Sequence, residues 1–188
     1  MEALPATKPL GLLSIVILIL GLSFLVIHWP QGRHATFSGH AAAQRVTIWY
    51  YIALFGTSLP LLFIFFRWWF VPAFHLTYWF WLLTLGSELL QHTVTIIPEV
   101  GGWKTKWHRR LTAGSALFLL PVLGILIASN SLALSIRCVA TFSLIGMLFI
   151  VAYQTFVADK AKPKNLLLWQ TAYYGLFFIP IMIATYTH

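Results

Sequence analysis

Long uncharged stretches recur along the whole chain and alternate with short polar segments. Six windows contain no Asp, Glu, Lys or Arg: 9–32, 46–66, 68–87, 111–136, 138–158 and 165–188. A helix of about 20 residues, rising about 1.5 Å per residue, crosses the roughly 30 Å hydrocarbon core of a bilayer. Every window is long enough to do so. Because backbone polar groups in lipid must be satisfied within their own segment, the windows predict membrane-spanning helices.

Proline, glycine, serine and asparagine between the windows mark where each helix ends. The predicted spans are about 10–28, 46–66, 73–96, 111–129, 135–157 and 166–186. The connections leave no room for a soluble domain, so residues 1–188 predict a single domain, an all-α polytopic membrane bundle of six transmembrane helices. Pro60, Pro121 and Pro180 fall inside spans and predict kinks.

Composition agrees with this interpretation and changes the meaning of the charge. Hydrophobic residues make up 60% of the chain, and the formal net charge is +8. In a soluble protein such a charge would suggest nucleic acid. Here the cations lie in short loops beside apolar spans, so we expect no nucleic-acid binding and instead contact with anionic lipid headgroups. The single cysteine, Cys138, excludes an internal disulfide.

The basic residues fall unevenly on the two sides of the predicted membrane. One side carries Lys8, Arg67 and Arg137. The other side carries the rest: Arg33, Arg45, Lys104, Lys106, Arg109, Arg110, Lys160, Lys162 and Lys164. Because basic loops stay inside, these loops are predicted to be cytoplasmic and both termini to be outside.

The segment 98–110 interleaves tryptophans with cations, a pattern typical of an interfacial loop. Its candidate lipid-headgroup contacts are Lys104, Lys106, His108, Arg109 and Arg110. Each cation near an anionic surface contributes roughly 1 kcal/mol to attraction.

Glu88 is the one acidic residue predicted to lie deep within a span. It precedes the end of the third span by about nine residues, or roughly 14 Å, which places it near the bilayer midplane. A carboxylate at that depth costs at least a few kcal/mol unless it is paired, hydrated or protonated. We therefore expect a polar partner for Glu88.

A polar stripe accompanies Glu88 along the same helix. Gln91, His92 and Thr95 follow Glu88 at spacings of three and four, and Thr84 extends the stripe by one turn. Arg45, at the start of the second span, is long enough to reach it.

Two interpretations of this candidate buried polar site stay open. It is a proton-accepting or ligand-coordinating site, or it is a structural hydrogen-bond network with polar residues of neighbouring spans. The candidates for that network are Tyr50, Tyr51, Gln154 and Tyr174.

Histidines cluster on the predicted cytoplasmic side, which raises the question of a metal or haem. His40, His92 and His108, together with Glu88 or Glu99, could supply ligands to a catalytic zinc. However, no pair of histidines has the spacing of a helical metal motif. We expect no bound metal and no other cofactor.

Two segments carry a family resemblance. Pro98-Glu99 ends the third span, and Trp107-His108-Arg109 precedes a span that contains Gly114 and Ser115. This layout resembles the broad class of small six-span membrane proteins that includes the DRAM/Frag/Sfk-like families and uncharacterised prokaryotic relatives. The resemblance implies a six-span fold and assigns no site residue. It also implies cytoplasmic termini, whereas the charge count predicts external ones.

These observations favour three functions. The first is a multi-pass membrane protein without enzymatic activity that uses the polar site to transport a small solute or proton, or to bind a lipid. The second is a metal-dependent intramembrane enzyme that acts on a lipid through Glu88, His92, His108 and His40. The third is a structural or regulatory subunit that pairs with another membrane protein or with its own copies.

Overall fold

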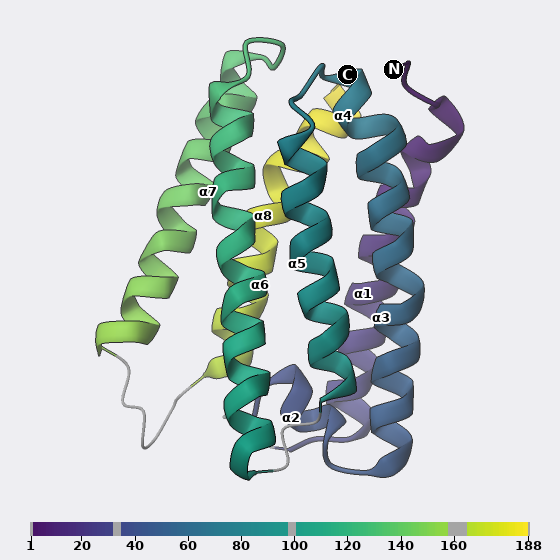
Figure 1. Ribbon diagram of the computed structural model, residues 1–188, viewed down its shortest axis with the longest axis vertical. Coiled ribbons are helices and arrows are strands. Elements are labelled where there is room, and N and C mark those ends of the chain that lie inside the picture. The colour runs from purple at the N-terminus through teal and green to yellow at the C-terminus, as the bar shows by residue number, and fades with distance from the viewer. Residues whose placement is uncertain (1, 32–34, 98–100, 158–164, 188) are drawn as a thin grey trace.

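Helices account for almost all of the protein. The structure, a computed structural model, describes residues 2–31, 35–97, 101–157 and 165–187 (Figure 1), and no strand occurs in this part of the chain. The long helices are α1 (Lys8–His28), α3 (Arg45–Phe65), α5 (Trp79–Ile96), α6 (Gly102–Ala128), α7 (Leu134–Ala152) and α8 (Leu166–Thr187). The short elements are η1 (Pro5–Thr7), α2 (Phe37–Ala41), the π-helical η2 (Phe66–Phe70), α4 (Val71–Ala73) and the π-helical η3 (Tyr153–Val157). The predicted all-α fold is confirmed.

Five helical segments in the described part of the chain are long and apolar enough to cross a membrane. They are Pro5–His28, Arg45–Ala73, Gly102–Ala128, Leu134–Val157 and Leu166–Thr187. Helix α5, which corresponds to the third predicted span, is not among them. It has only 18 residues, and Glu88, Gln91 and His92 lower its hydropathy.

Two predicted helix boundaries are wrong. The third span was expected to begin at 73, but α5 begins at Trp79, because His75 adopts a left-handed conformation with φ of 48° that a helix cannot continue. The segment up to Arg110 was expected to be a loop, but α6 already begins at Gly102. Lysine and arginine are good helix formers, and the Thr105 hydroxyl accepts a hydrogen bond from the Gly101 amide at 2.8 Å, which stabilises the first turn.

The long helices pack mainly as antiparallel neighbours in chain order. Helix α5 lies between α3 and α6, and α8 lies behind α5 and α6 in the view of Figure 1. Helix α7 packs against α6 and α8 at the edge of the bundle. Both termini lie at the same end, which we call the terminal end.

The terminal end is filled by a cluster of aromatic side chains. Phe66, Phe70 and Phe80 are almost completely buried, and the ring of Phe80 lies 5.4 Å from that of Phe66 and 5.3 Å from that of Phe70. The Nζ atom of Lys8 lies 4.9 Å from the ring of Trp69 and 6.0 Å from that of Tyr186. This cation therefore holds α1 close to η2 and α8 at the terminal end.

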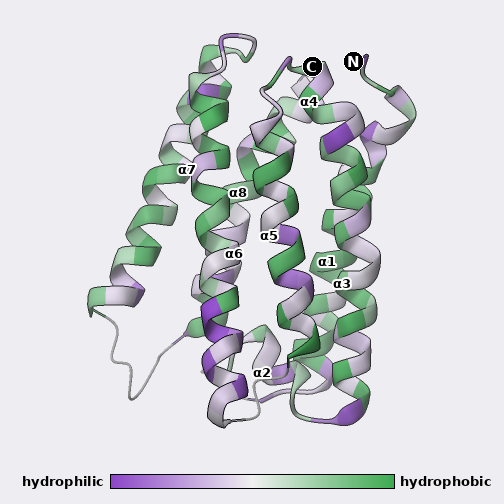
Figure 2. Cartoon of the chain, in the orientation of Figure 1, coloured by the Kyte–Doolittle hydropathy of each residue, from purple (hydrophilic) through white to green (hydrophobic). Residues whose placement is uncertain are grey.

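The opposite end carries the exposed cations Arg45, Lys104, Lys106, Arg109 and Arg110, and we call it the basic end. Figure 2 shows apolar residues over most of the helices, with hydrophilic positions near the two ends and partway along α5.

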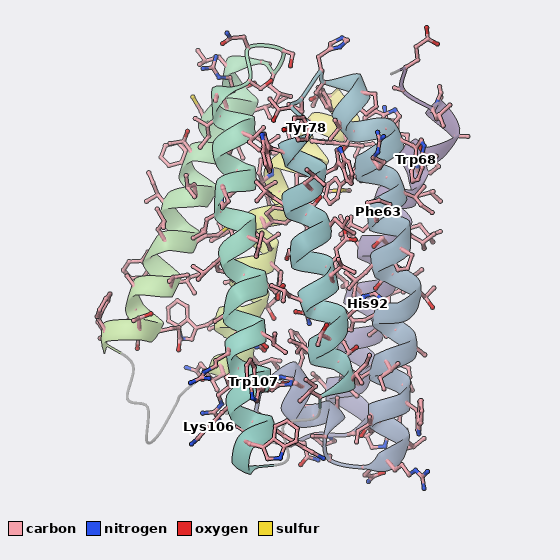
Figure 3. The ribbon with its side chains drawn as sticks, in the orientation of Figure 1. Phe63, Trp68, Tyr78, His92, Lys106 and Trp107 are labelled. Atoms are coloured by element: carbon pink, nitrogen blue, oxygen red, sulfur yellow. The ribbon has the colours of Figure 1, made fainter. Side chains whose placement is uncertain are left out.

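Exposed aromatic residues lie at both ends of the bundle. Figure 3 shows Trp68 and Tyr78 toward the terminal end and Trp107 toward the basic end. This arrangement of an apolar band between two aromatic belts is typical of proteins that reside in a bilayer.

Helix α1 carries glycines on the face that packs against α3, and the two helices therefore approach each other closely. A β-carbon added at Gly11 would lie 2.8 Å from the ring of Phe65, which is fully buried, whereas one added at Gly56 meets nothing within 4 Å.

We expect Gly11→Ala to lower the free energy of unfolding by about 1–3 kcal/mol through overpacking. The control Gly56→Ala should be neutral or stabilising, because Ala favours the helix. Thermal unfolding of the purified variants in detergent measures both, and equal effects would contradict the close approach.

Candidate functional site

A chamber of about 480 Å³ lies inside the bundle, between α1, α3, α5, α6 and α8. Pockets of roughly 300–1,000 Å³ hold single small ligands in other proteins. The residues that line it on α1 run from Ile15 to Ile27, and those on α8 run from Leu167 to Phe178. Both stretches lie mostly in the half of their helix nearer the basic end, so the chamber extends from the middle of the bundle toward that end.

The walls of the chamber differ in polarity. Helices α1 and α3 supply mainly apolar side chains: Ile15, Leu18, Leu22, Val26, Phe55, Leu59 and Leu62. Helices α5, α6 and α8 supply most of the polar ones: Thr84, Ser87, Glu88, Gln91, His108, Thr112, Ser115, Gln170, Thr171 and Tyr174. An apolar wall opposite a polar wall suits an amphipathic ligand.

The chamber opens sideways between α1 and α8. Ile19 and Ile27 line the chamber and are nevertheless 58% and 79% exposed, and Thr171 and Gly175 on α8 also combine lining with exposure. Helices α1 and α8 do not pack extensively against each other. The mouth therefore lies on the apolar flank of the bundle and not at one of its ends.

Hydrogen bonds inside the protein satisfy most of the polar wall. Ser87 and Ser115 join α5 to α6 reciprocally: the Ser87 hydroxyl donates to the Ser115 carbonyl at 2.9 Å, and the Ser115 hydroxyl donates to the Ser87 carbonyl at 3.0 Å. The Tyr174 hydroxyl donates to Oε1 of Gln91 at 3.4 Å and links α8 to α5. Tyr174 is thus one of the network residues anticipated from the sequence.

Glu88 is the exception on this wall. Its side chain is only 8% exposed and lines the chamber, yet its Oε1 atom has no hydrogen-bond partner in the described part of the chain. Glu88 lies near the middle of α5, roughly 13 Å from either end of the helix. The wall of the chamber therefore includes a carboxyl group at half the depth of the bundle, one oxygen of which is buried and unsatisfied.

The structure brings together only part of the predicted polar site. Gln91 lines the chamber beside Glu88, and Thr95 is buried one turn further along α5. His92 is half-buried on α5 and does not line the chamber (Figure 3). Arg45 is exposed at the first residue of α3 and is not paired with Glu88, since the positions lie at different depths of the bundle.

The predicted headgroup contacts divide in a similar way. Lys104, Lys106, Arg109 and Arg110 are exposed at the basic end, and Figure 3 shows Lys106 there. His108 is only 3% exposed, and its Nδ1–H group donates to the carbonyl oxygen of Ile97 at 2.6 Å. Because it donates to the residue that directly follows α5, His108 is part of the packing between α5 and α6, and unlike the four cations it is not exposed.

The other histidines do not converge on a metal centre. No three metal-binding side chains come together in the described residues. His40 is buried in α2, with its Nδ1 atom 3.0 Å from the carbonyl oxygen of Trp29, and it does not line the chamber. Glu99 lies outside the described residues, as do these cations of the predicted cytoplasmic side: Arg33, Lys160, Lys162 and Lys164.

Sequence reasoning identified the contribution of α5 to this site and Tyr174 on α8, but it missed the polar face of α6 and the other polar residues of α8, Gln170 and Thr171. On α6, His108, Thr112, Ser115 and Leu119 follow one another at spacings of four, three and four, and they share one face. This spacing was a usable signal, but the cations beside His108 suggested a loop.

No family model matches the chain, and neither a curated protein nor a solved structure shows significant similarity to it. The resemblance to small six-span membrane proteins accordingly stays a prediction. Any function must be argued from the chamber itself.

The hydrogen bond between His108 and Ile97 predicts that His108 contributes to stability, as an exposed histidine would not. We expect His108→Ala to lower the free energy of unfolding by about 1–3 kcal/mol, because it leaves the Ile97 carbonyl without its donor. The exposed neighbour Lys106 is the control, and Lys106→Ala should change stability by no more than about 0.5 kcal/mol. Denaturation in detergent measures both. Equal stability of the two variants would show that the hydrogen bond contributes nothing.

Proposed function

We propose that this chain is an integral membrane protein that binds one amphipathic, lipid-like molecule in the chamber. The observation that carries the proposal is the lateral mouth between α1 and α8, whose rim includes the exposed Ile19 and Ile27. A ligand dissolved in the bilayer can enter through such a mouth without crossing water. Its apolar part then lies along α1 and α3, and its polar part faces α5.

The proposal includes a placement in the membrane. Helix α5 is the sixth span, and its polar side chains are tolerated because they face the chamber and the neighbouring helices. The basic end lies in the cytoplasm, where its exposed cations attract anionic headgroups, and both termini lie outside. The aromatic belts at the two ends mark the two interfaces.

Binding explains the chamber better than conduction does. A path for a proton or small solute needs polar groups that continue toward both ends of the bundle. Toward the terminal end the chamber meets Phe66 and Phe177, and the buried Phe70 and Phe80 lie beyond Phe66. This packed aromatic cluster favours a pocket that is closed at that end.

The lateral mouth can be tested by obstructing it. Gly175 lines the mouth on α8 and has no atom near the position of an added β-carbon; the same holds for Gly56 on α3, which does not line the chamber. We expect Gly175→Leu to fill the mouth and to reduce the amount of lipid that stays bound during purification by about tenfold, the equivalent of about 1.4 kcal/mol. Gly56→Leu should retain lipid as the unmodified chain does.

Native mass spectrometry of protein released from detergent counts the bound lipid per chain. Unchanged retention in Gly175→Leu would contradict entry through this mouth. Absence of bound lipid from the unmodified chain, together with no binding of added single-chain amphiphiles, would contradict the proposed function.

The placement in the membrane gives a separate prediction. Reporter domains inserted between Lys104 and Lys106 should score as cytoplasmic, and a reporter fused to the C-terminus should score as external, because the basic end is retained inside. Paired alkaline phosphatase and fluorescent protein fusions report the two locations. A cytoplasmic C-terminus would overturn the orientation, and opposite sides for the two termini would overturn the six-span arrangement.

A further inference from the structure

The chamber also indicates what kind of head the ligand carries, an inference that rests on the proposed function. All six hydroxyl groups on the polar wall already donate their protons to the protein. Those of Thr84, Ser87, Thr112, Ser115 and Thr171 donate to backbone carbonyls, and that of Tyr174 donates to Gln91. A hydroxyl that donates its one proton retains only lone pairs for a ligand.

The histidine on this wall also donates its ring proton to the protein. The Nδ1–H group of His108 donates to Ile97, so in the neutral imidazole Nε2 is an acceptor. The donors left to a ligand on this wall are the carboxamide groups of Gln91 and Gln170. The wall is therefore rich in acceptors and poor in donors.

Glu88 adds an unsatisfied acceptor to this wall. Its Oε1 atom has no partner within the described residues, and none of these residues that line the chamber is a lysine or an arginine. A carboxylate at half the depth of an apolar bundle is costly unless a counter-charge, water or a bound proton offsets it. The described lining residues supply no counter-charge, so a cationic ligand is suited to supply it.

We infer that the chamber binds a single-chain amphiphile with a cationic amine head, held by the carboxyl group of Glu88. An ammonium group has three N–H donors and no acceptor, which complements a wall of lone pairs. Its hydrogen bond to a carboxylate is charge-assisted and roughly twice as strong as a neutral one. A phosphate or carboxylate head would instead meet Glu88, and the described lining residues offer no cation to offset the repulsion.

Three ligands with the same twelve-carbon chain test the head directly: dodecylamine, 1-dodecanol and dodecanoate. We expect the full-length chain in detergent to bind dodecylamine about tenfold more tightly than 1-dodecanol, and dodecanoate most weakly. Titrations followed by native mass spectrometry give the three dissociation constants. This ranking needs no variant, so it remains decisive even if substitutions at Glu88 disturb folding.

Glu88→Gln then assigns the effect to the carboxyl group. Dodecylamine should lose about tenfold in affinity and become equal to 1-dodecanol, whose own affinity should stay within about threefold. The control Glu2→Gln removes the same charge at an exposed position and should leave all three constants unchanged.

The outcomes separate the two proposals. Tightest binding of dodecanoate, or a preference for dodecylamine that survives Glu88→Gln, would overturn the amine head while leaving a lipid-binding chamber. Failure of all three ligands to bind the unmodified chain would overturn the lipid-binding function itself.

Discussion

A carboxyl group buried halfway along an apolar bundle constrains everything around it. Glu88 cannot face hydrocarbon without a cost of several kcal/mol, so α5 must turn its polar stripe toward the interior. Ser115 of α6 and Tyr174 of α8 meet it, and their hydrogen bonds with Ser87 and Gln91 connect these two helices to α5. The apolar faces of the helices are left on the outside, where a membrane suits them.

The two halves of the bundle are packed differently. At the terminal end, the phenylalanines of η2 and α5 fill the interior, and Lys8 links α1 to aromatic residues of η2 and α8. Toward the basic end, the helices enclose the chamber, whose mouth lies between α1 and α8. The packing at the terminal end holds the helices in place. In the half nearer the basic end, a polar wall and an apolar wall face the same chamber. A chamber can persist in one half of the bundle because the other half is tightly packed.

The errors in the sequence predictions have different causes. The cations near the start of α6 were interpreted as loop residues, because charge is an unfavourable feature for a membrane span. These residues are nevertheless good helix formers, and at the basic end they lie in a first turn that is exposed. The pairing of Arg45 with Glu88 failed for a different reason. A long side chain can be judged from sequence to be able to reach, but whether its helix places it at the right depth depends on packing.

The sequence by itself determined that the chain is helical, where most helices end, and that Glu88 and Gln91 share a buried face near mid-depth. These features depend on local patterns of hydropathy and on the helical repeat. Only the tertiary structure decided that His108 is buried against Ile97, that Ser87, Ser115 and Tyr174 donate their hydroxyl protons to neighbouring helices, and that a mouth opens between α1 and α8. Those features depend on how separate elements of the fold meet. The helical repeat shows which side of a helix is buried, but only packing decides which other helix meets it and where a space remains.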